Sequence, residues 1–200
     1  MIELVAFLGN PGVEYALNRH NAGRLLAEKS TRSCIPWQRK FKGLYMGVDV
    51  EASGGYAAGA SKKAHFLKPE TFMNRSGDAV SSAAFFFKLP VENILIVHDE
   101  LDLALGEVSL KFSGGLNGHN GLRSIKAAFN SVDFWRLRIG IGRPADGDVY
   151  KWVLSDFTAD EKPALDAALA AADRALTRAL IEGAENLLPE WKKKQAYEVQ

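Results

Sequence analysis

The sequence predicts an α/β protein built as a single-domain three-layer sandwich, in which helices flank a twisted, mixed and largely parallel central sheet. Short apolar runs alternate along the chain with longer segments of helical character, and this alternation is typical of strands that pair in parallel through helical crossovers. The chain has 200 residues, of which 47% are apolar and 24% charged. That length suits one sizeable core and is short for two. We therefore expect one domain over residues 1–200, with a C-terminal helical segment from about residue 158 to residue 200.

The expected strands are apolar runs bounded by Gly, Pro, Asn or acidic residues. In chain order they are Ile2–Leu8, Leu44–Val50, Ala64–Leu67, Asn93–Val97, Val108–Phe112 and Trp135–Ile141. The expected helices alternate with several of these strands. They are Asn21–Ser30, Gly77–Phe87, Gly121–Phe129 and Ala164–Ile181.

Local signals predict where some of these elements begin and end. Thr158 followed by Glu161 is typical of a capping box that opens the last helix, and Gly183 is typical of its end. Gly54–Gly55 and Gly59 indicate turns within an antiparallel edge of the sheet.

Composition excludes several classes of protein. A single cysteine, Cys34, cannot form an internal disulfide framework and fits a reducing compartment, so we expect a cytoplasmic protein. The segment Met1–Leu8 lacks a basic region and a cleavage site, which favours a strand over a signal peptide. No apolar run approaches the roughly 20 residues needed to span a bilayer. Net charge is only +1, so a polyanion would have to bind a local basic patch.

Polar residues gather in segments that follow the predicted strands, where ligands of open α/β sheets bind. These segments are Gly9–Tyr15 together with Arg19–Gly23, then Pro69–Gly77, His98–Asp102 and Ser113–Leu122. The glycine turn after the first strand lacks the spacing Gly-x-Gly-x-x-Gly, and Pro11 removes a backbone donor that a phosphate would need. A dinucleotide cofactor is therefore not expected.

The histidines do not predict a metal site. His20, His65, His98 and His119 show no paired spacing, and the lone cysteine has no partner. A single histidine beside a helix start is more often a cap or a surface residue than a catalytic base. A serine nucleophile is not predicted either, because the Gly-x-Ser-x-Gly elbow is absent.

Asp99 ends an apolar strand, where an unpaired carboxylate would be costly, so it needs a partner. That partner could be a helix cap, a salt bridge or a catalytic group. Asn10, Asn74 and Asn120 lie in three separate loops, and each alone would be interpreted as a cap or a turn residue. Three carboxamides around one histidine instead favour a polar binding site, because they both donate and accept hydrogen bonds.

Two predicted strands offer basic side chains. Alternation in Val108–Phe112 places Ser109 and Lys111 on the face opposite the apolar residues, and Arg138 lies similarly in Trp135–Ile141. Solvation alone explains most such charges. The run Trp191–Lys194 could contact phosphate, although a charged, frayed terminus explains it more simply.

The four polar segments, in this order and spacing, resemble the signature motifs of bacterial-type peptidyl-tRNA hydrolases from residue 2 to about Gly142. The helical segment after Gly142 is compatible with this family but carries few motifs that would identify it. The resemblance implies that His20 acts as general base on a water molecule. It implies that Asp99 accepts a hydrogen bond from His20, and that Asn10, the third catalytic residue, orients substrate or water. Glu100 and Asp102 would be nearer to solvent-facing or capping residues.

The resemblance also implies the binding residues. Asn74 and Asn120 would contact the peptide and the 3′ end of the tRNA, with His119 beside them, while Tyr15 and Phe72 add stacking surface; Phe72 could equally belong to the core. Lys111 and Arg138 would clamp the 5′ phosphate of the acceptor stem. The family often has a second lysine where this chain has Ser109, which could weaken the clamp.

The expected partner is therefore peptidyl-tRNA, cleaved by a monomer without metal or cofactor in the cytoplasm. A noncatalytic RNA-binding relative on the same fold, such as a splicing-factor homologue, is the alternative. Retention of His20, Asp99 and the asparagines argues against it. A third option is a metal-free esterase that acts on a small N-acylated ester. Such a substrate gives no reason for the basic residues Lys111 and Arg138.

Overall fold

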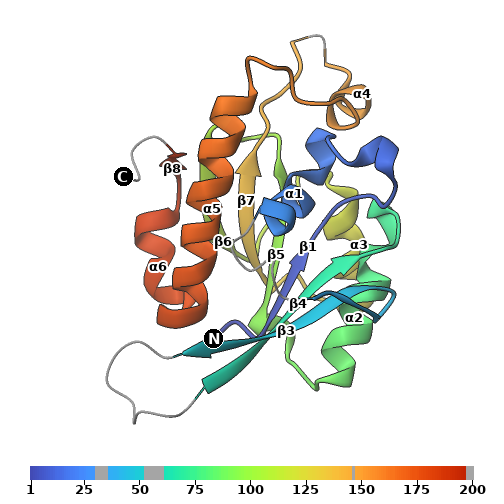
Figure 1. Cartoon of the computed structure of the whole chain (residues 1–200), viewed down its shortest axis with the longest axis vertical. Coiled ribbons are helices and arrows are strands. Elements are labelled where there is room, and N and C mark those ends of the chain that lie inside the picture. Colours follow the sequence, from blue (N-terminus) through green and yellow to red (C-terminus); the bar gives the residue numbers. More distant parts are fainter. Residues whose placement is uncertain (30–35, 52–60, 146, 197–200) are drawn as a thin grey trace.

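The computed structural model describes residues 1–29, 36–51, 61–145 and 147–196. Within these residues the chain forms one sheet with the strand order β2-β3-β4-β1-β5-β7-β6-β8 (Figure 1). In chain order the strands are β1 (Leu4–Phe7), β2 (Gln38–Lys40), β3 (Gly43–Glu51), β4 (Ser61–Pro69), β5 (Ile94–Glu100), β6 (Glu107–Phe112), β7 (Trp135–Gly140) and β8 (Lys194–Gln195).

The centre of the sheet is parallel and both edges are antiparallel. β4, β1, β5 and β7 run in one direction, while β2 and β3 on one side and β6 and β8 on the other pair antiparallel. The carboxyl ends of the four parallel strands therefore meet at one edge of the sheet, which is where ligands of α/β folds bind.

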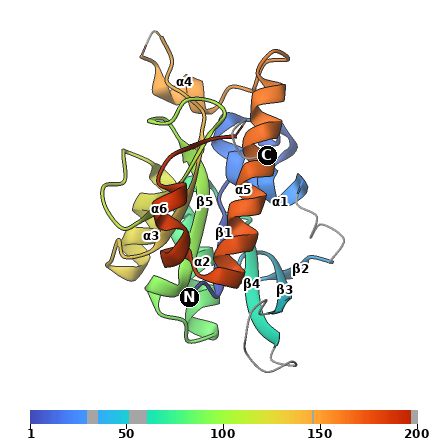
Figure 2. The ribbon, with the colours of Figure 1, turned by 90° about the vertical axis from the view of Figure 1, so that its left-hand side faces the viewer.

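Helices cover both faces of the sheet. The α-helices are α1 (Ala22–Lys29), α2 (Ser76–Phe86), α3 (Asn120–Phe129), α4 (Val149–Val153), α5 (Lys162–Glu182) and α6 (Ala184–Trp191). Short 3₁₀ turns are η1 (Val13–Tyr15), η2 (Arg19–Asn21), η4 (Met73–Arg75) and η5 (Val91–Asn93). Figure 2 shows α1 and α5 on one side of β1 and β5, and α2 and α3 on the other. No helix in the described part of the chain is long and apolar enough to span a membrane.

Alternation along β1 divides the core between these two layers. Val5 and Phe7 pack with α1 and α5, whereas Leu4 and Ala6 pack with α2 and α3. Side chains of successive strand residues point to opposite faces, so a strand that is apolar at every position must be covered on both sides. The predicted three-layer sandwich is confirmed.

All the predicted strands and helices are present, with shifted ends. β5 was expected to stop at Val97 but continues to Glu100, and every one of its residues is buried. β2 was missed because its three residues are polar and exposed, as befits an edge strand. β8, α4 and α6 were also missed, each of them short.

The predicted ends of the last long helix are partly right. Gly183 ends α5 with a φ of 92°, a conformation that favours glycine. The capping box is only half present: the Glu161 carboxylate accepts a hydrogen bond from the backbone N–H of Thr158 at 2.8 Å, but the helix begins at Lys162 without a side-chain cap. Thr158 lies too far upstream to cap it. The turns expected at Gly54–Gly55 and Gly59 lie outside the described residues.

Candidate active site

The polar residues predicted at strand ends meet at the carboxyl edge of the parallel strands. η2, which carries His20, packs beside the end of β5, where Asp99 lies. Gly23 makes this approach possible, because a Cβ atom there would lie 2.4 Å from the carbonyl oxygen of Val97. The absence of a side chain at Gly23 thus lets α1 and η2 approach the sheet closely.

His20 and Asp99 form a buried hydrogen-bonded pair. Nδ1 of His20 lies 2.9 and 3.0 Å from the two carboxylate oxygens of Asp99. A carboxylate accepts, so Nδ1 carries the proton and Nε2 keeps a free lone pair. Burial alone would lower the pKa of His20, but the charge of Asp99 and its hydrogen bond together raise that pKa above its ordinary value.

His119 is a second partner of Asp99. Its Nε2 lies 3.0 Å from Oδ1 of Asp99, and its Nδ1 accepts the backbone N–H groups of Gly121 and Leu122 at 3.1 and 3.4 Å as the N-cap of α3. Nδ1 therefore has no proton, and Nε2 donates to the carboxylate. Burial would raise the pKa of Asp99, but the two imidazoles hold it well below its usual range.

Asn10 is held in place by its neighbours. Its Oδ1 accepts the backbone N–H of Met73 at 2.8 Å. Its backbone N–H and carbonyl are both bonded to the side chain of Asn21, at 2.8 and 2.9 Å. The Nδ2 group of Asn10 has no hydrogen-bond partner among the described residues and can donate to a ligand. This role of Asn21 was not predicted, although the residue directly follows His20 in one of the polar segments.

The three asparagines line one cavity with His20. This cavity of about 360 Å³ is bounded by Asn10, Asn74, Asn120 and His20, together with Tyr15 and Phe72. In the described part of the chain, no protein group is hydrogen-bonded to the side-chain amides of Asn74 and Asn120. Tyr15 meets Phe72 edge to face, with ring centroids 6.5 Å apart, and Phe72 is 57% exposed. Phe72 is thus a wall of the cavity and not part of the core.

A second cavity, of about 370 Å³, opens on the other side of His20 and includes Asp99, Glu100, His119 and Asn120. The short helix α4 borders both cavities through Tyr150 and Val153. Arg19, beside His20, fixes this helix, because its guanidinium lies 3.7 Å from the ring centroid of Trp152.

Comparison with known proteins identifies the family. The family model described as peptidyl-tRNA hydrolase matches residues 4–198. The chain belongs to the peptidyl-tRNA hydrolase family. The peptidyl-tRNA hydrolase of Treponema pallidum is 44% identical over 201 residues, covering 97% of this chain and 96% of that protein. The peptidyl-tRNA hydrolase of Desulfitobacterium hafniense is 39% identical over 190 residues, covering 94% of this chain and 97% of that protein.

Solved structures of the family share the fold. The crystal structure of peptidyl-tRNA hydrolase from Acinetobacter baumannii has a TM-score of 0.77 at 37% identity and covers 96% of each chain. A point mutant of the Acinetobacter baumannii enzyme has a TM-score of 0.81 at 35% identity, covering 98% of this chain and 96% of that one. The matched range and these coverages extend the family likeness through the C-terminal helices, which the sequence motifs did not reach.

The basic residues associated with the family lie on β6 and β7, but their surroundings differ from those expected. Lys111 is paired across the sheet with Arg136 and Ser109 with Arg138. Burial, together with the charges of the two arginines, lowers the pKa of Lys111. Arg138 is half-buried and donates to the Glu100 carboxylate at 2.9 Å. Its charge is therefore already balanced by the protein.

Ser109 and Glu100 are less exposed than expected. Ser109 is buried and donates to the backbone carbonyl of Lys192, because the segment after α6 covers this end of β6. Glu100 does not face solvent: it is 4% exposed, because β5 extends to include it. Its Oε1 does cap the turn that follows, by accepting the backbone N–H of Asp102 at 3.1 Å, and Asp102 is exposed as expected.

The C-terminal run is not a frayed terminus. Trp191 is 1% exposed and belongs to the core, and Lys193 pairs with Glu107 at 3.0 Å. Lys194 begins β8, which pairs with β6. The end of the described chain is therefore part of the sheet.

His20, Asp99 and His119 each place a potential ligand atom within 4.8 Å of the others, although their sequence spacing indicated no metal site. A metal ion requires unprotonated ligand nitrogens. Nε2 of His119 must keep its proton, because Nδ1 of the same ring accepts two backbone N–H groups. This donor set fits a hydrogen-bonded triad better than a set of metal ligands.

The substitution Asp99→Asn should lower the pKa of His20. The amide removes the negative charge that raises this pKa and leaves the burial that lowers it. We expect the His20 imidazole to titrate below its ordinary value of 6.5, measured by NMR of the ring carbons. The matched control Asp102→Asn, which removes an exposed carboxylate, should leave the titration unchanged. A His20 pKa equal to that of the unsubstituted protein would contradict the role of Asp99.

Proposed function

We propose that the chain hydrolyses the ester bond between a peptide and the 3′-terminal ribose of tRNA, with His20 as general base. The observation that carries the proposal is the His20–Asp99 pair, whose hydrogen bond fixes the proton on Nδ1 and leaves Nε2 unprotonated. His20 borders a cavity lined by three asparagines. A neutral imidazole in such a cavity is suited to accept a proton from water.

The reaction then needs only side chains and water. Water attacks the ester carbonyl carbon as Nε2 of His20 takes its proton, and Asp99 stabilises the imidazolium that forms. The tetrahedral adduct collapses by breaking the bond to the ribose oxygen. His20 returns the proton to that oxygen, so the products are a peptide with a free carboxylate, a tRNA with a free 3′ hydroxyl, and one released proton.

His119 supports this step without being the base. Its lone pair at Nδ1 is occupied by the N-terminus of α3, and its Nε2–H points at the carboxylate. It therefore keeps Asp99 ionised and fixed, which is the state that His20 requires. Among the predicted substrate-binding residues, we reassign His119 to this positioning role.

The asparagines are proposed to recognise the peptide. Asn74 and Asn120 offer free amides, and Asn10 offers its Nδ2 group, so the site can pair with the carbonyl and N–H groups of a peptide bond. Aminoacyl-tRNA presents a charged amine there instead. A site built from neutral hydrogen-bonding groups discriminates against it, because its own polar groups would stay unpaired.

Lys111 and Arg138 are proposed to contact the 5′ phosphate of the acceptor stem. Lys111 is the stronger candidate, because Glu100 already balances Arg138. We further propose a cytoplasmic monomer. The single cysteine fits a reducing compartment, and light scattering in solution tests the oligomeric state.

Substitution of His20 by alanine tests the proposal. We expect His20→Ala to lower kcat on N-acetyl-aminoacyl-tRNA by about 10²- to 10⁴-fold, the range for a positioned acid-base group, with tRNA affinity within a few-fold. His65→Gln is the matched control, because His65 packs on Phe87 outside the site. A His20→Ala protein that kept a third of the rate would overturn the mechanism. Tight tRNA binding without turnover by the wild type would instead favour a noncatalytic RNA-binding role.

A double-mutant cycle tests the 5′ phosphate contact. The value of kcat/KM is measured for wild type and Lys111→Ala on N-acetyl-aminoacyl-tRNA with and without its 5′ phosphate, at fixed ionic strength. If Lys111 contacts the phosphate, removing both partners should cost little more than removing one. We expect a coupling of about 1 kcal/mol, the scale for a partly exposed charge pair, and a smaller one for Arg138→Ala. Strictly additive penalties would refute the contact.

A further inference from the structure

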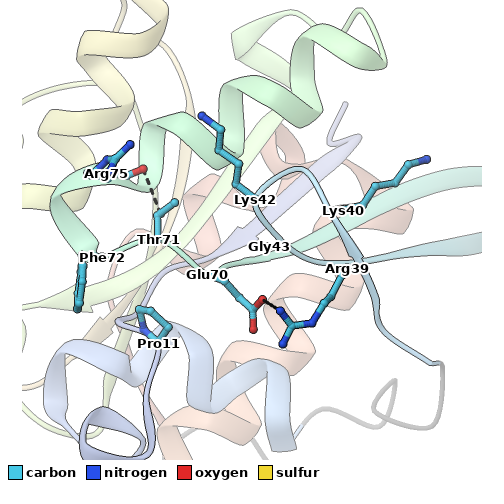
Figure 3. Close-up of a pocket in the computed structure, with 9 residues that line it drawn as sticks. All are labelled: Pro11, Arg39, Lys40, Lys42, Gly43, Glu70, Thr71, Phe72 and Arg75. Carbon is cyan, nitrogen blue, oxygen red and sulfur yellow. Dashed lines mark hydrogen bonds and ion pairs between the residues drawn. The ribbon is translucent and has the colours of Figure 1, made fainter.

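A basic cavity lies beyond Phe72, next to the cavity that contains His20. Its volume is about 560 Å³, and Phe72 lines both cavities. Figure 3 shows Pro11 and Phe72 on one side of it and Arg39, with its partner Glu70, on the other. Nothing in the reaction described above uses this cavity.

Its place in the sheet relates it to the path of the substrate. It is formed by the β2–β3 turn and the chain that follows β4, since Gly43 pairs with Pro69. It therefore opens at the same edge of the sheet as His20 and Asp99. β6 and β7, with Lys111 and Arg138, lie on the opposite side of β1 and β5.

The cavity has an excess of positive charge. Its basic residues are Arg39, Lys40, Lys42 and Arg75. Two carboxylates face them: Glu70 lies 3.5 Å from Arg39, and Asp78 lies 2.8 Å from Arg75 and 3.8 Å from Lys42.

Lys40 also lines the cavity, but its side chain points away from Phe72 and Thr71 (Figure 3). Its Nζ lies 4.9 Å from the ring centroid of Phe86 and 5.2 Å from that of Phe41, and no carboxylate among the described residues forms an ion pair with it. The other three cations, Arg39, Lys42 and Arg75, face only the two carboxylates named above among the described residues. An anionic group that enters the cavity therefore meets one positive charge in excess.

The turn that carries these cations is strained and firmly anchored. Phe41 and Lys42 have φ values of 54° each, as in a two-residue hairpin turn that normally uses Asn-Gly. Such conformations are costly for ordinary side chains and persist only where the surroundings impose them. Here the Phe41 ring packs against Tyr45 and Phe87, with centroids 5.3 and 5.4 Å away. The cations are thus presented from a fixed backbone.

We propose that this cavity binds an acidic side chain of the peptide, N-terminal to the residue that is esterified to the tRNA. The inference rests on the proposed function, which places the ester at His20 and the acceptor stem towards β6 and β7. The peptide must then leave the site in the other direction, past Phe72, and its upstream side chains reach the basic cavity. Cationic side chains recognise a carboxylate by charge and hydrogen bonding.

A set of peptidyl-tRNAs tests this inference. The substrates share one tRNA and one peptide length, and carry glutamate, glutamine or lysine at each upstream position in turn. At the position that reaches the cavity, wild type should have a kcat/KM about threefold to tenfold higher for glutamate than for lysine, the range for exposed charge pairs. Lys42→Glu should abolish or reverse this preference. The matched control Lys63→Glu, an exposed site near the opposite end of β4, should retain it.

The outcomes separate the inference from the proposed function. Equal kcat/KM for glutamate and lysine at every position would overturn the peptide site. So would a Lys42→Glu penalty of equal size on N-acetyl-aminoacyl-tRNA, which has no upstream residue, because that result would assign the cavity to RNA. In both cases wild type still cleaves N-acetyl-aminoacyl-tRNA and the proposed function stands. Failure to cleave that minimal substrate would overturn both proposals.

Discussion

The buried carboxylate of Asp99 is the constraint on which the site depends. It is 2% exposed, at the end of a strand whose residues are all buried, and an isolated charge in such a place would be too costly to keep. Imidazole N–H groups from His20 and His119 approach it from two different segments. Satisfying this one charge fixes the tautomer of both rings, holds η2 against β5, and connects the start of α3 to the same point.

The surrounding contacts keep this cluster in register. Asn21 ties the loop after β1 to η2, and Asn10 in turn holds the start of η4 through Met73. Arg19 stacks on Trp152 and binds Glu161 at 2.7 Å, which attaches α4 and the approach to α5 to the residue beside His20. The loops that line the cleft are thus held in position by contacts with one another as well as by their attachment to the sheet. This arrangement gives the precise positioning that proton transfer requires.

The residues proposed for the tRNA, the site of the proposed chemistry and the basic cavity follow one another across the sheet in the order in which the substrate would meet them. Towards β6 and β7 lie the residues proposed for the tRNA, at β1 and β5 lies the proposed chemistry, and towards β2 lies the basic cavity proposed for the peptide. A substrate that joins RNA to peptide through one ester needs such an asymmetric cleft. The antiparallel strands added at each edge of the parallel core supply its two ends.

Periodicity predicted the layers and the meeting of strand ends, because alternation of apolar residues is a local property that burial preserves. It could not predict β2, whose three residues are polar and exposed. Nor could it predict the burial of Glu100, which pairs with Arg138 from a strand that is adjacent in the sheet but 38 residues away in the sequence. His119 was grouped with the substrate-binding residues, since its bond to Asp99 arises only when α3 begins beside β5. Ser109 was misplaced because the segment covering it follows by more than eighty residues.

The central claim is that the neutral Nε2 of His20, tuned by Asp99, is the base. The direct measurement compares two titrations of the same wild-type protein: the pH dependence of kcat/KM on N-acetyl-aminoacyl-tRNA, and the NMR titration of His20. Because the pKa of His20 is raised, the rate should fall as pH decreases through a midpoint above 6.5, and the two midpoints should coincide. A rate that persists after His20 is fully protonated would contradict the account.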